Sequence, residues 1–184
     1  MSVFEFSELR LEQVISHAVP MDFDCGDPDL NEYFCKDSVS YRKELLTASY
    51  QVLKKGDGSD FPIALVDFCN DAVRREELGG GARRKIHHLK RGFKAFPAVK
   101  ITRLGVQKEL QGKGLGSLIL DMIKHFLVEK RQFGCRFLTL DAYHTRVDFY
   151  KRNHFRELQI EAERNSNETV PMFFDLKGLQ EPAL

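Results

Sequence analysis

The stretch Gln111-Gly112-Lys113-Gly114-Leu115-Gly116 places three glycines within five positions. Glycine has no Cβ and costs backbone order, so a cluster of glycines indicates that something approaches the main chain closely. A strand-like run precedes the cluster and a long amphipathic run follows it. The first amides of a helix have no partner inside the helix and lie at the positive end of its dipole. This arrangement is suited to a phosphate or diphosphate, with Lys113 adding positive charge at the rim.

Two other nucleotide-binding motifs fit these residues less well. A Walker-type phosphate loop requires Ser or Thr after the lysine and a glycine five positions before the second glycine, but Gly114 and Gln107 stand there. A dinucleotide fingerprint requires a third glycine at position 117, which is Ser117, and it normally opens the first strand–turn–helix unit. A plain helix start without a ligand remains the alternative.

Other residues that could carry chemistry have simpler explanations. The four cysteines form no Cys-x-x-Cys pair and match no zinc spacing, so we interpret them as core residues. His87 and His88 supply two metal ligands without an evident third, and we therefore expect no metal. Residues 83–94 contain six lysines or arginines and no acid, which is typical of a solvated face or of a site for a polyanion such as tRNA.

The composition is that of an ordinary globular protein. The chain has 184 residues, 42% apolar and 30% charged, and its formal net charge is +1, so no global field attracts nucleic acid or a membrane. We expect one domain spanning 1–184. No apolar run is long enough to cross a bilayer, and charges interrupt the start of the chain where a signal peptide would be apolar. We therefore expect a cytoplasmic protein without membrane contact.

The elements that must position these residues follow from hydrophobic periodicity. A hairpin is expected at 48–69, with its turn at Gly56-Asp57-Gly58. Further strands are expected at 3–9, 98–106, 135–143, 155–160 and 170–176, and helices at 25–46, 114–132 and 145–155. The strand at 135–143 is almost continuously apolar, which predicts burial on both faces. Asp27 is expected to cap the first helix, which would bury a face of Leu30, Phe34, Tyr41 and Leu45. Residues 70–97, and above all the basic part at 79–97, read as a polar, mobile excursion.

The segment ITRLGVQKELQGKGLGSLIL, residues 101–120, resembles the acetyl-CoA-binding motif of the GNAT superfamily of N-acetyltransferases, whose pattern is Gln/Arg-x-x-Gly-x-Gly/Ala. Residues 136–155 look like the family's next strand and its Phe-Tyr-containing helix. The resemblance covers 98–156. Residues 23–34 and 94–106 are more weakly similar to toxin-like acetyltransferases that modify aminoacyl-tRNA, although the arginine usual in the second strand of those toxins is absent.

The resemblance implies a mixed α/β fold, in which helices flank a central, mostly antiparallel sheet of about six to seven strands that is splayed at the motif strand. It implies acetyl-CoA as co-substrate, with the pantetheine arm along the motif strand and the diphosphate on the amides from Gln111 to Gly116. The implied contact residues are Leu104, Gly105, Val106, Gln111, Gly112, Lys113, Gly114, Leu115, Gly116 and Ser117. Tyr150 matches the family's general acid, although the residue pattern alone would make it a core aromatic beside Phe149.

This sequence departs from the family pattern at two places. Tyr143 stands near the position of a family asparagine, and His154 replaces a glycine, so we expect Asn153 to adopt a positive φ nearby. The general base is not identified among Asp67, Asp141 and His144.

Three functions remain open: acetylation of a primary amine, acetylation of aminoacyl-tRNA with tRNA held by residues 83–94, and CoA binding without turnover. A homodimer is expected from base rates alone.

Overall fold

The computed structural model describes residues 5–15, 22–55, 61–86, 93–130, 134–160 and 168–179. The chain divides into two compact units, one formed by Met1–Cys69 with Ile101–Ile123 and the other by Asn70–Lys100 with Lys124–Leu184. Two strands and the longest helix contribute residues to both units. The expectation of a single domain over 1–184 stays a prediction.

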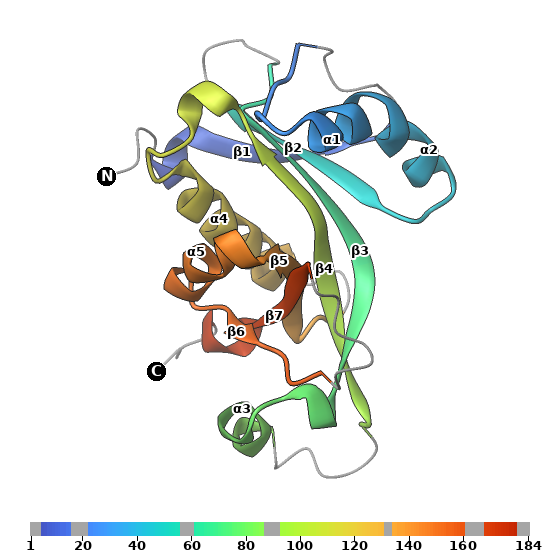
Figure 1. Ribbon diagram of the computed structural model, residues 1–184, viewed down its shortest axis with the longest axis vertical. Coiled ribbons are helices and arrows are strands. Elements are labelled where there is room, and N and C mark those ends of the chain that lie inside the picture. The colour runs from blue at the N-terminus through green and yellow to red at the C-terminus, as the bar shows by residue number, and fades with distance from the viewer. Residues whose placement is uncertain are drawn as a thin grey trace. The chain divides into compact units, whose positions relative to one another are not determined.

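One seven-stranded sheet has the strand order β1-β2-β3-β4-β5-β7-β6 (Figure 1). Its strands are β1 (Leu9–Val14), β2 (Ala48–Lys54), β3 (Ala64–Arg74), β4 (Ala95–Val106), β5 (Phe137–Tyr143), β6 (Arg156–Glu157) and β7 (Thr169–Asp175). The helices are α1 (Pro28–Glu32), α2 (Ser38–Lys43), α3 (Gly80–Lys85), α4 (Leu115–Lys130) and α5 (Val147–Arg152). The sheet is mostly antiparallel with one parallel pair, so the predicted mixed α/β fold is confirmed.

The first unit begins differently from the expectation. Residues 1–4 of the predicted first strand lie outside the described part, and Phe6–Glu8 form a 3-10 turn, so the strand starts only at Leu9. The Glu8 carboxylate accepts the Glu5 amide across three residues, which favours the turn over extended backbone. The predicted hairpin is confirmed: β2 and β3 pair antiparallel, with Val52 opposite Ala64.

The helix predicted at 25–46 consists of α1, a π-helical turn at Tyr33–Asp37, and α2. The Asp27 carboxylate caps it by accepting the amides of Asp29 and Leu30, as expected. Phe34 is buried, but Leu45 is 90% exposed and has a φ of 57°, beyond the last helical residue. The π-helical turn and the early helix end shift the periodicity, so the expected face including Tyr41 and Leu45 was wrong.

The excursion predicted at 70–97 was also wrong in its main part. β3 continues to Arg74, a 3-10 turn follows, and α3 places Ala82 and Ile86 on one face. Both are buried in the core cluster of the second unit, formed by Val73, Leu78, Ala82, Ile86, Phe96, Ala98, Phe137 and Phe173. Residues 87–92 of the basic run, including His87 and His88, lie outside the described residues. Residues 70–86 are therefore folded, because Val73, Leu78, Ala82 and Ile86 pack in this cluster although charged residues surround them in the sequence.

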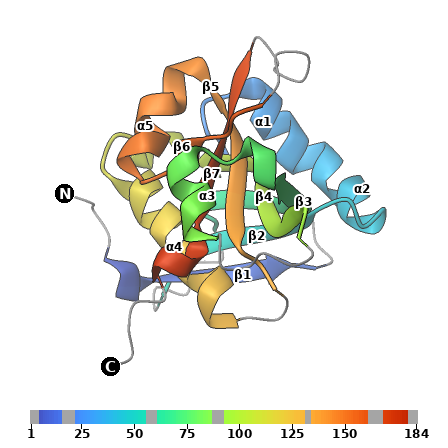
Figure 2. The same ribbon diagram turned by 90° about the horizontal axis from the view of Figure 1, so that it is seen from below.

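In the second unit β5 pairs antiparallel with β7, and Phe137, Leu138, Thr139 and Leu140 are all buried, as the apolar run predicted. Figure 1 and Figure 2 both show α5 beside α4, and Lys124 on α4 contacts the end of α5. Among the described residues, no helix has both the length and the apolar character needed to cross a membrane.

Candidate active site

The glycine turn before α4 has the backbone that its sequence requires. Gly112 and Gly114 have φ values of 74° and 77°, in the region that other residues rarely adopt. A Cβ placed on Gly112 would meet no atom within 4 Å in the described part of the chain. Packing therefore does not explain Gly112, and the space in front of its main chain is open.

The amides of this turn are available for a ligand. The Leu118 amide makes the first hydrogen bond of α4, to the Gly114 carbonyl at 3.3 Å. Within the described residues, none of the amides from Gly112 to Ser117 donates to a backbone carbonyl. The Gln111 amide, by contrast, donates to the Lys108 carbonyl at 3.2 Å, so the available run begins one residue later than expected. Six consecutive N–H groups at a helix start fit the diphosphate of CoA.

Side chains on the turn hold its shape. Gln111 Nε2 donates to two carbonyls, of Cys25 at 2.7 Å and of Val106 at 2.9 Å, and so ties the turn to β4 and to the segment before α1. Lys113 Nζ donates to the Glu109 carbonyl at 2.9 Å. Sequence reasoning assigned Gln111 only an amide contact. The preference for Gln or Arg at this motif position was the available signal, because both side chains can donate to two acceptors.

The motif strand places Gly105 against the core of the first unit. A Cβ on Gly105 would lie 3.0 Å from Phe34 Cε2, 3.2 Å from Cys25 Cβ and 3.3 Å from Phe23 Cε1. Close packing is therefore sufficient to require glycine here. Leu104 and Val106, expected to pair with the pantetheine arm through their main chains, are partly exposed on either side of it.

Tyr150 lies on α5 in the second unit. Its ring makes edge contacts with Phe149 and Phe155, at centroid distances of 5.1 and 5.7 Å. Burial raises the pKa of Tyr150 above its ordinary value, and the positive charge of Arg146 opposes the shift. In the described part of the chain its hydroxyl makes no hydrogen bond. The phenol is therefore protonated at neutral pH and available as a proton donor.

The end of α5 corrects one expectation. His154 has a φ of 66°, whereas Asn153 has a φ of −91°, so the histidine and not the asparagine adopts the left-handed conformation. The Asn153 side chain instead donates to the Phe149 carbonyl at 2.9 Å, and its own amide donates to the Phe149 and Tyr150 carbonyls. Asn153 closes the helix, which leaves the next residue to make the turn.

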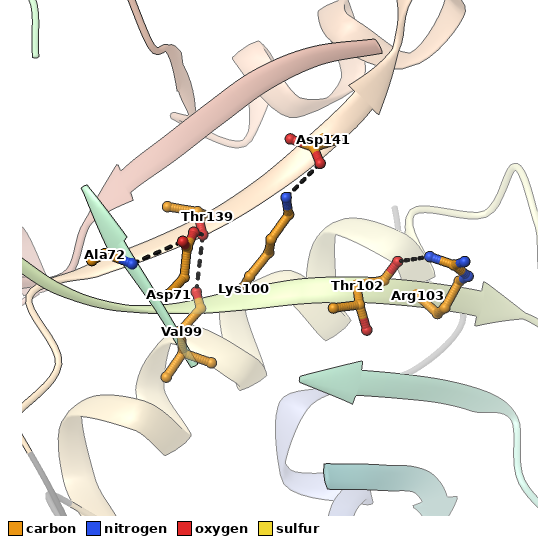
Figure 3. A network of polar contacts seen from close by, with 8 residues as sticks. All are labelled: Asp71, Ala72, Val99, Lys100, Thr102, Arg103, Thr139 and Asp141. Carbon is orange, nitrogen blue, oxygen red and sulfur yellow. Dashed lines mark hydrogen bonds and ion pairs between the residues drawn. The ribbon is translucent and has the colours of Figure 1, made fainter. Parts of the chain in front are cut away.

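The candidate bases have different surroundings. In the second unit Asp141 on β5 forms an ion pair with Lys100 on β4, next to Thr139, which donates to Asp71 (Figure 3). His144 is exposed in a 3-10 turn, and the neighbouring Tyr143 is 59% exposed. The contacts of these residues do not identify any of them as the general base.

Asp67, in the first unit, is fully buried. Its Oδ2 accepts the Tyr33 hydroxyl at 2.6 Å and the Thr47 hydroxyl at 3.2 Å, while its Oδ1 has no hydrogen-bond partner among the described residues. Burial, and then the hydrogen bond and charge of Asp67, raise the pKa of Tyr33 well above its usual range. The Arg103 guanidinium lies 5.0 Å from the centre of the Tyr33 ring. Tyr33 was not singled out from the sequence, where it looks like one more core aromatic.

All ten predicted cofactor positions thus lie on one segment of the first unit, at the end of β4 and the start of α4. Tyr150, Asp141 and His144 belong to the second unit. The structure brings the cofactor residues together, and their roles and that of Tyr150 stay predictions.

Known structures share this fold along almost the whole chain. AtaT complexed with acetyl-methionyl-tRNA has a TM-score of 0.75 and 20% identity, covering 94% of this chain and 98% of that one. A tyrosine-to-phenylalanine mutant of KacT has a TM-score of 0.74 and 18% identity, with coverages of 95% and 98%. AtaTR bound with acetyl-CoA has a TM-score of 0.69 and 21% identity, with coverages of 95% and 97%.

A family model described as an acetyltransferase (GNAT) domain matches residues 89–176, a range that includes all of β4, the glycine turn, α4, β5 and α5. The superfamily resemblance is therefore confirmed, and the weaker resemblance to toxin-like acetyltransferases holds at the level of the fold. Residues 89–176 thus match an acetyltransferase domain of the GNAT superfamily.

Proposed function

We propose that this protein transfers the acetyl group of acetyl-CoA to a primary amine by direct attack. The observation that carries the proposal is the run of available amides from Gly112 to Ser117, with open space in front of Gly112. The match of an acetyltransferase domain to residues 89–176 supports it independently. Acetyl-CoA supplies an acetyl group activated as a thioester, so no nucleophilic side chain is required.

Tyr150 is the proposed general acid. The amine nitrogen forms a bond to the acetyl carbon, the carbon–sulfur bond breaks, and the departing sulfur takes the proton of the Tyr150 hydroxyl. The nitrogen loses one proton to solvent, and the phenolate regains one, so protons balance. The raised pKa of Tyr150 keeps the phenol protonated through neutral pH, which this role requires.

Aminoacyl-tRNA is the second candidate acceptor. It is favoured by the similarity of the fold to AtaT, whose solved complex contains acetyl-methionyl-tRNA. Arg83, Arg84 and Lys85 are exposed on α3 and offer three positive charges that a phosphate backbone could meet. The Arg usual in the second strand of the toxin-like enzymes is missing, so the primary-amine proposal is kept broader than tRNA. A cytoplasmic location is proposed with this substrate.

Release of free CoA in the presence of acetyl-CoA and a panel of amines tests the function. The panel should contain small primary amines, peptides with free N-termini and charged aminoacyl-tRNA, with secondary amines and uncharged tRNA as controls. We expect acetyl-dependent thiol release with at least one primary amine. CoA binding by calorimetry without release for any acceptor would favour a CoA-binding module, and the absence of binding at millimolar CoA would contradict the whole proposal.

The contribution of α3 to a tRNA acceptor has its own test. The triple variant Arg83→Ala, Arg84→Ala, Lys85→Ala should weaken tRNA binding and reduce its salt dependence, because each lost phosphate contact lowers the slope by about 1. Turnover of small amines should be unchanged, since α3 carries none of the proposed cofactor residues. An unchanged salt slope would exclude α3 from tRNA binding.

A further inference from the structure

Lys124 is a buried cation that the proposed chemistry does not use. It lies on α4 and is 1% exposed. Its Nζ donates to the Asn153 carbonyl at 3.0 Å and lies 4.5 Å from the ring centre of Phe174 and 5.5 Å from that of Phe155. A cation above an aromatic face is attracted by the ring's negative charge distribution, so these contacts offset part of the loss of water.

Packing of α4 does not explain a lysine at this position. Taking an ammonium group out of water is costly, and an apolar side chain of similar volume at such a site is often as stable or more stable. Ile119, Leu120 and Ile123 on the same helix are fully buried and apolar. The ammonium group is therefore better explained by its hydrogen bond to the carbonyl oxygen of Asn153 than by the volume that the side chain fills.

That atom belongs to the end of the helix carrying Tyr150. The Tyr150 carbonyl accepts the amides of Asn153 and Phe155, both at 3.0 Å, and the Phe149 carbonyl accepts Asn153 Nδ2. Lys124 holds the carbonyl of Asn153 itself.

The same ammonium group also reaches the ring that supports the tyrosine. Phe155 makes an edge contact with the Tyr150 ring at 5.7 Å and lies under Lys124 Nζ. Lys124 thus fixes both the main chain that ends α5 and the aromatic side chain that packs against Tyr150. We propose that Lys124 is a positioning residue that sets the orientation of the Tyr150 hydroxyl through Asn153 and Phe155; this rests on the proposed function of Tyr150 as general acid.

The variant Lys124→Met separates this role from stability. Methionine replaces most of the stem volume and removes the charge. We expect a thermal midpoint within a few degrees of the parent protein, because the lost hydrogen bond is offset by the gain from not burying a charge. The KM for acetyl-CoA should be unchanged, while kcat per CoA-binding site should fall at least about tenfold, since small displacements of a catalytic group are costly in rate. Ile123→Val is the matched control, with a lowered midpoint and an unchanged kcat.

A second readout does not depend on turnover. In protein labelled with fluorotyrosine, the fluorine resonance of Tyr150 is identified by its absence from Tyr150→Phe. Lys124→Met should shift or broaden that resonance, and Ile123→Val should leave it in place. If Lys124→Met fails to fold, Lys124→Leu, which also removes the ammonium group, provides the same comparison.

The double variant Lys124→Met, Tyr150→Phe distinguishes the possible failures. If Lys124 acts through Tyr150, the double variant should have the kcat of Tyr150→Phe alone. A further loss equal to that of the single Lys124 variant, or an unmoved fluorine resonance, would overturn the positioning role. If Tyr150→Phe alone keeps full kcat, the acid role of Tyr150 fails instead, and the fluorine measurement still reports whether Lys124 orients the ring.

Discussion

Replacing Gly112 by alanine tests the glycine turn with little disturbance to packing. The added methyl group meets no atom within 4 Å in the described part of the chain, so it creates no clash. The cost to folding is the positive φ of 74°, which is unfavourable for a residue with a Cβ by about 1–2 kcal/mol. For a protein of this size that corresponds to a fall in thermal midpoint of roughly 2–8 °C.

The effect on CoA should be larger than the effect on folding. The methyl group is added to a residue whose amide we expect to hold the diphosphate, and a change in the positive φ or a side chain beside that amide should weaken the contact with the anion. We expect the dissociation constant of CoA, measured by calorimetry below the melting range, to rise at least tenfold, about 1.4 kcal/mol. Pantetheine, which lacks the diphosphate, should bind the variant and the parent protein equally.

Gly134→Ala is the matched control, since a Cβ there also meets no neighbour within 4 Å and no positive φ is required. It should change neither stability nor CoA affinity. If Gly112→Ala bound CoA as tightly as the parent protein, the amides of this turn would not be the diphosphate site, and the reasoning from glycine to ligand would be refuted.

Four further predictions follow from the site. Gly105→Ala should lower the free energy of unfolding by about 1–3 kcal/mol through overpacking against Phe34, measured by denaturant titration; an unchanged value would show that the core can yield. Tyr150→Phe should reduce kcat by about 10²-fold or more with unchanged CoA affinity; full turnover would exclude the acid role. Because burial raises the pKa of Tyr150, the protonated acid persists to higher pH, so kcat should not decline between about pH 7 and 9; a fall within that range would point to another acid. Tyr33→Phe removes a donor from the buried Asp67 and should destabilise the fold by about 1–3 kcal/mol, with CoA binding retained, as thermal melts and calorimetry would check.

Local chemistry made much of the fold predictable from the sequence. Asp27 before Pro28 predicted the start of the first helix, and the apolar run at 135–143 predicted a strand buried on both faces, as observed at 137–140. The strand, glycine turn and helix at 98–130 were read correctly because each element agrees with its neighbours in period and turn chemistry.

The remaining errors have tertiary causes. The π-helical turn at Tyr33–Asp37 changes the face of the following helix, and no propensity signals it. Ala82 and Ile86 are only two apolar residues among charges, and the core cluster in which they are buried includes Phe137 and Phe173, which are distant in the chain. The turn at His154 followed from how Asn153 uses its side chain, which a list of residue preferences does not contain.

The site could be predicted only in its backbone part. Glycines report main-chain requirements directly, so positions 112 and 114 were identifiable. The contacts of Gln111 with Cys25, of Lys124 with Asn153 and of Asp67 with Tyr33 join residues 29 to 86 positions apart, and no local pattern predicts them.

The buried face of α3 has a consequence for its basic residues. Because Ala82 and Ile86 are buried in the core, Arg83, Arg84 and Lys85 are exposed on a helix of defined geometry and not on a flexible segment. A binding partner would therefore lose little chain entropy in engaging their backbone, since folding has already ordered it. Moving the two apolar residues, now Ala82 and Ile86, by one position would rotate the three cations by roughly 100° around the helix axis and leave the net charge unchanged. Binding that depends on the geometry of the cations would then be lost, whereas binding that depends only on their charge would be kept.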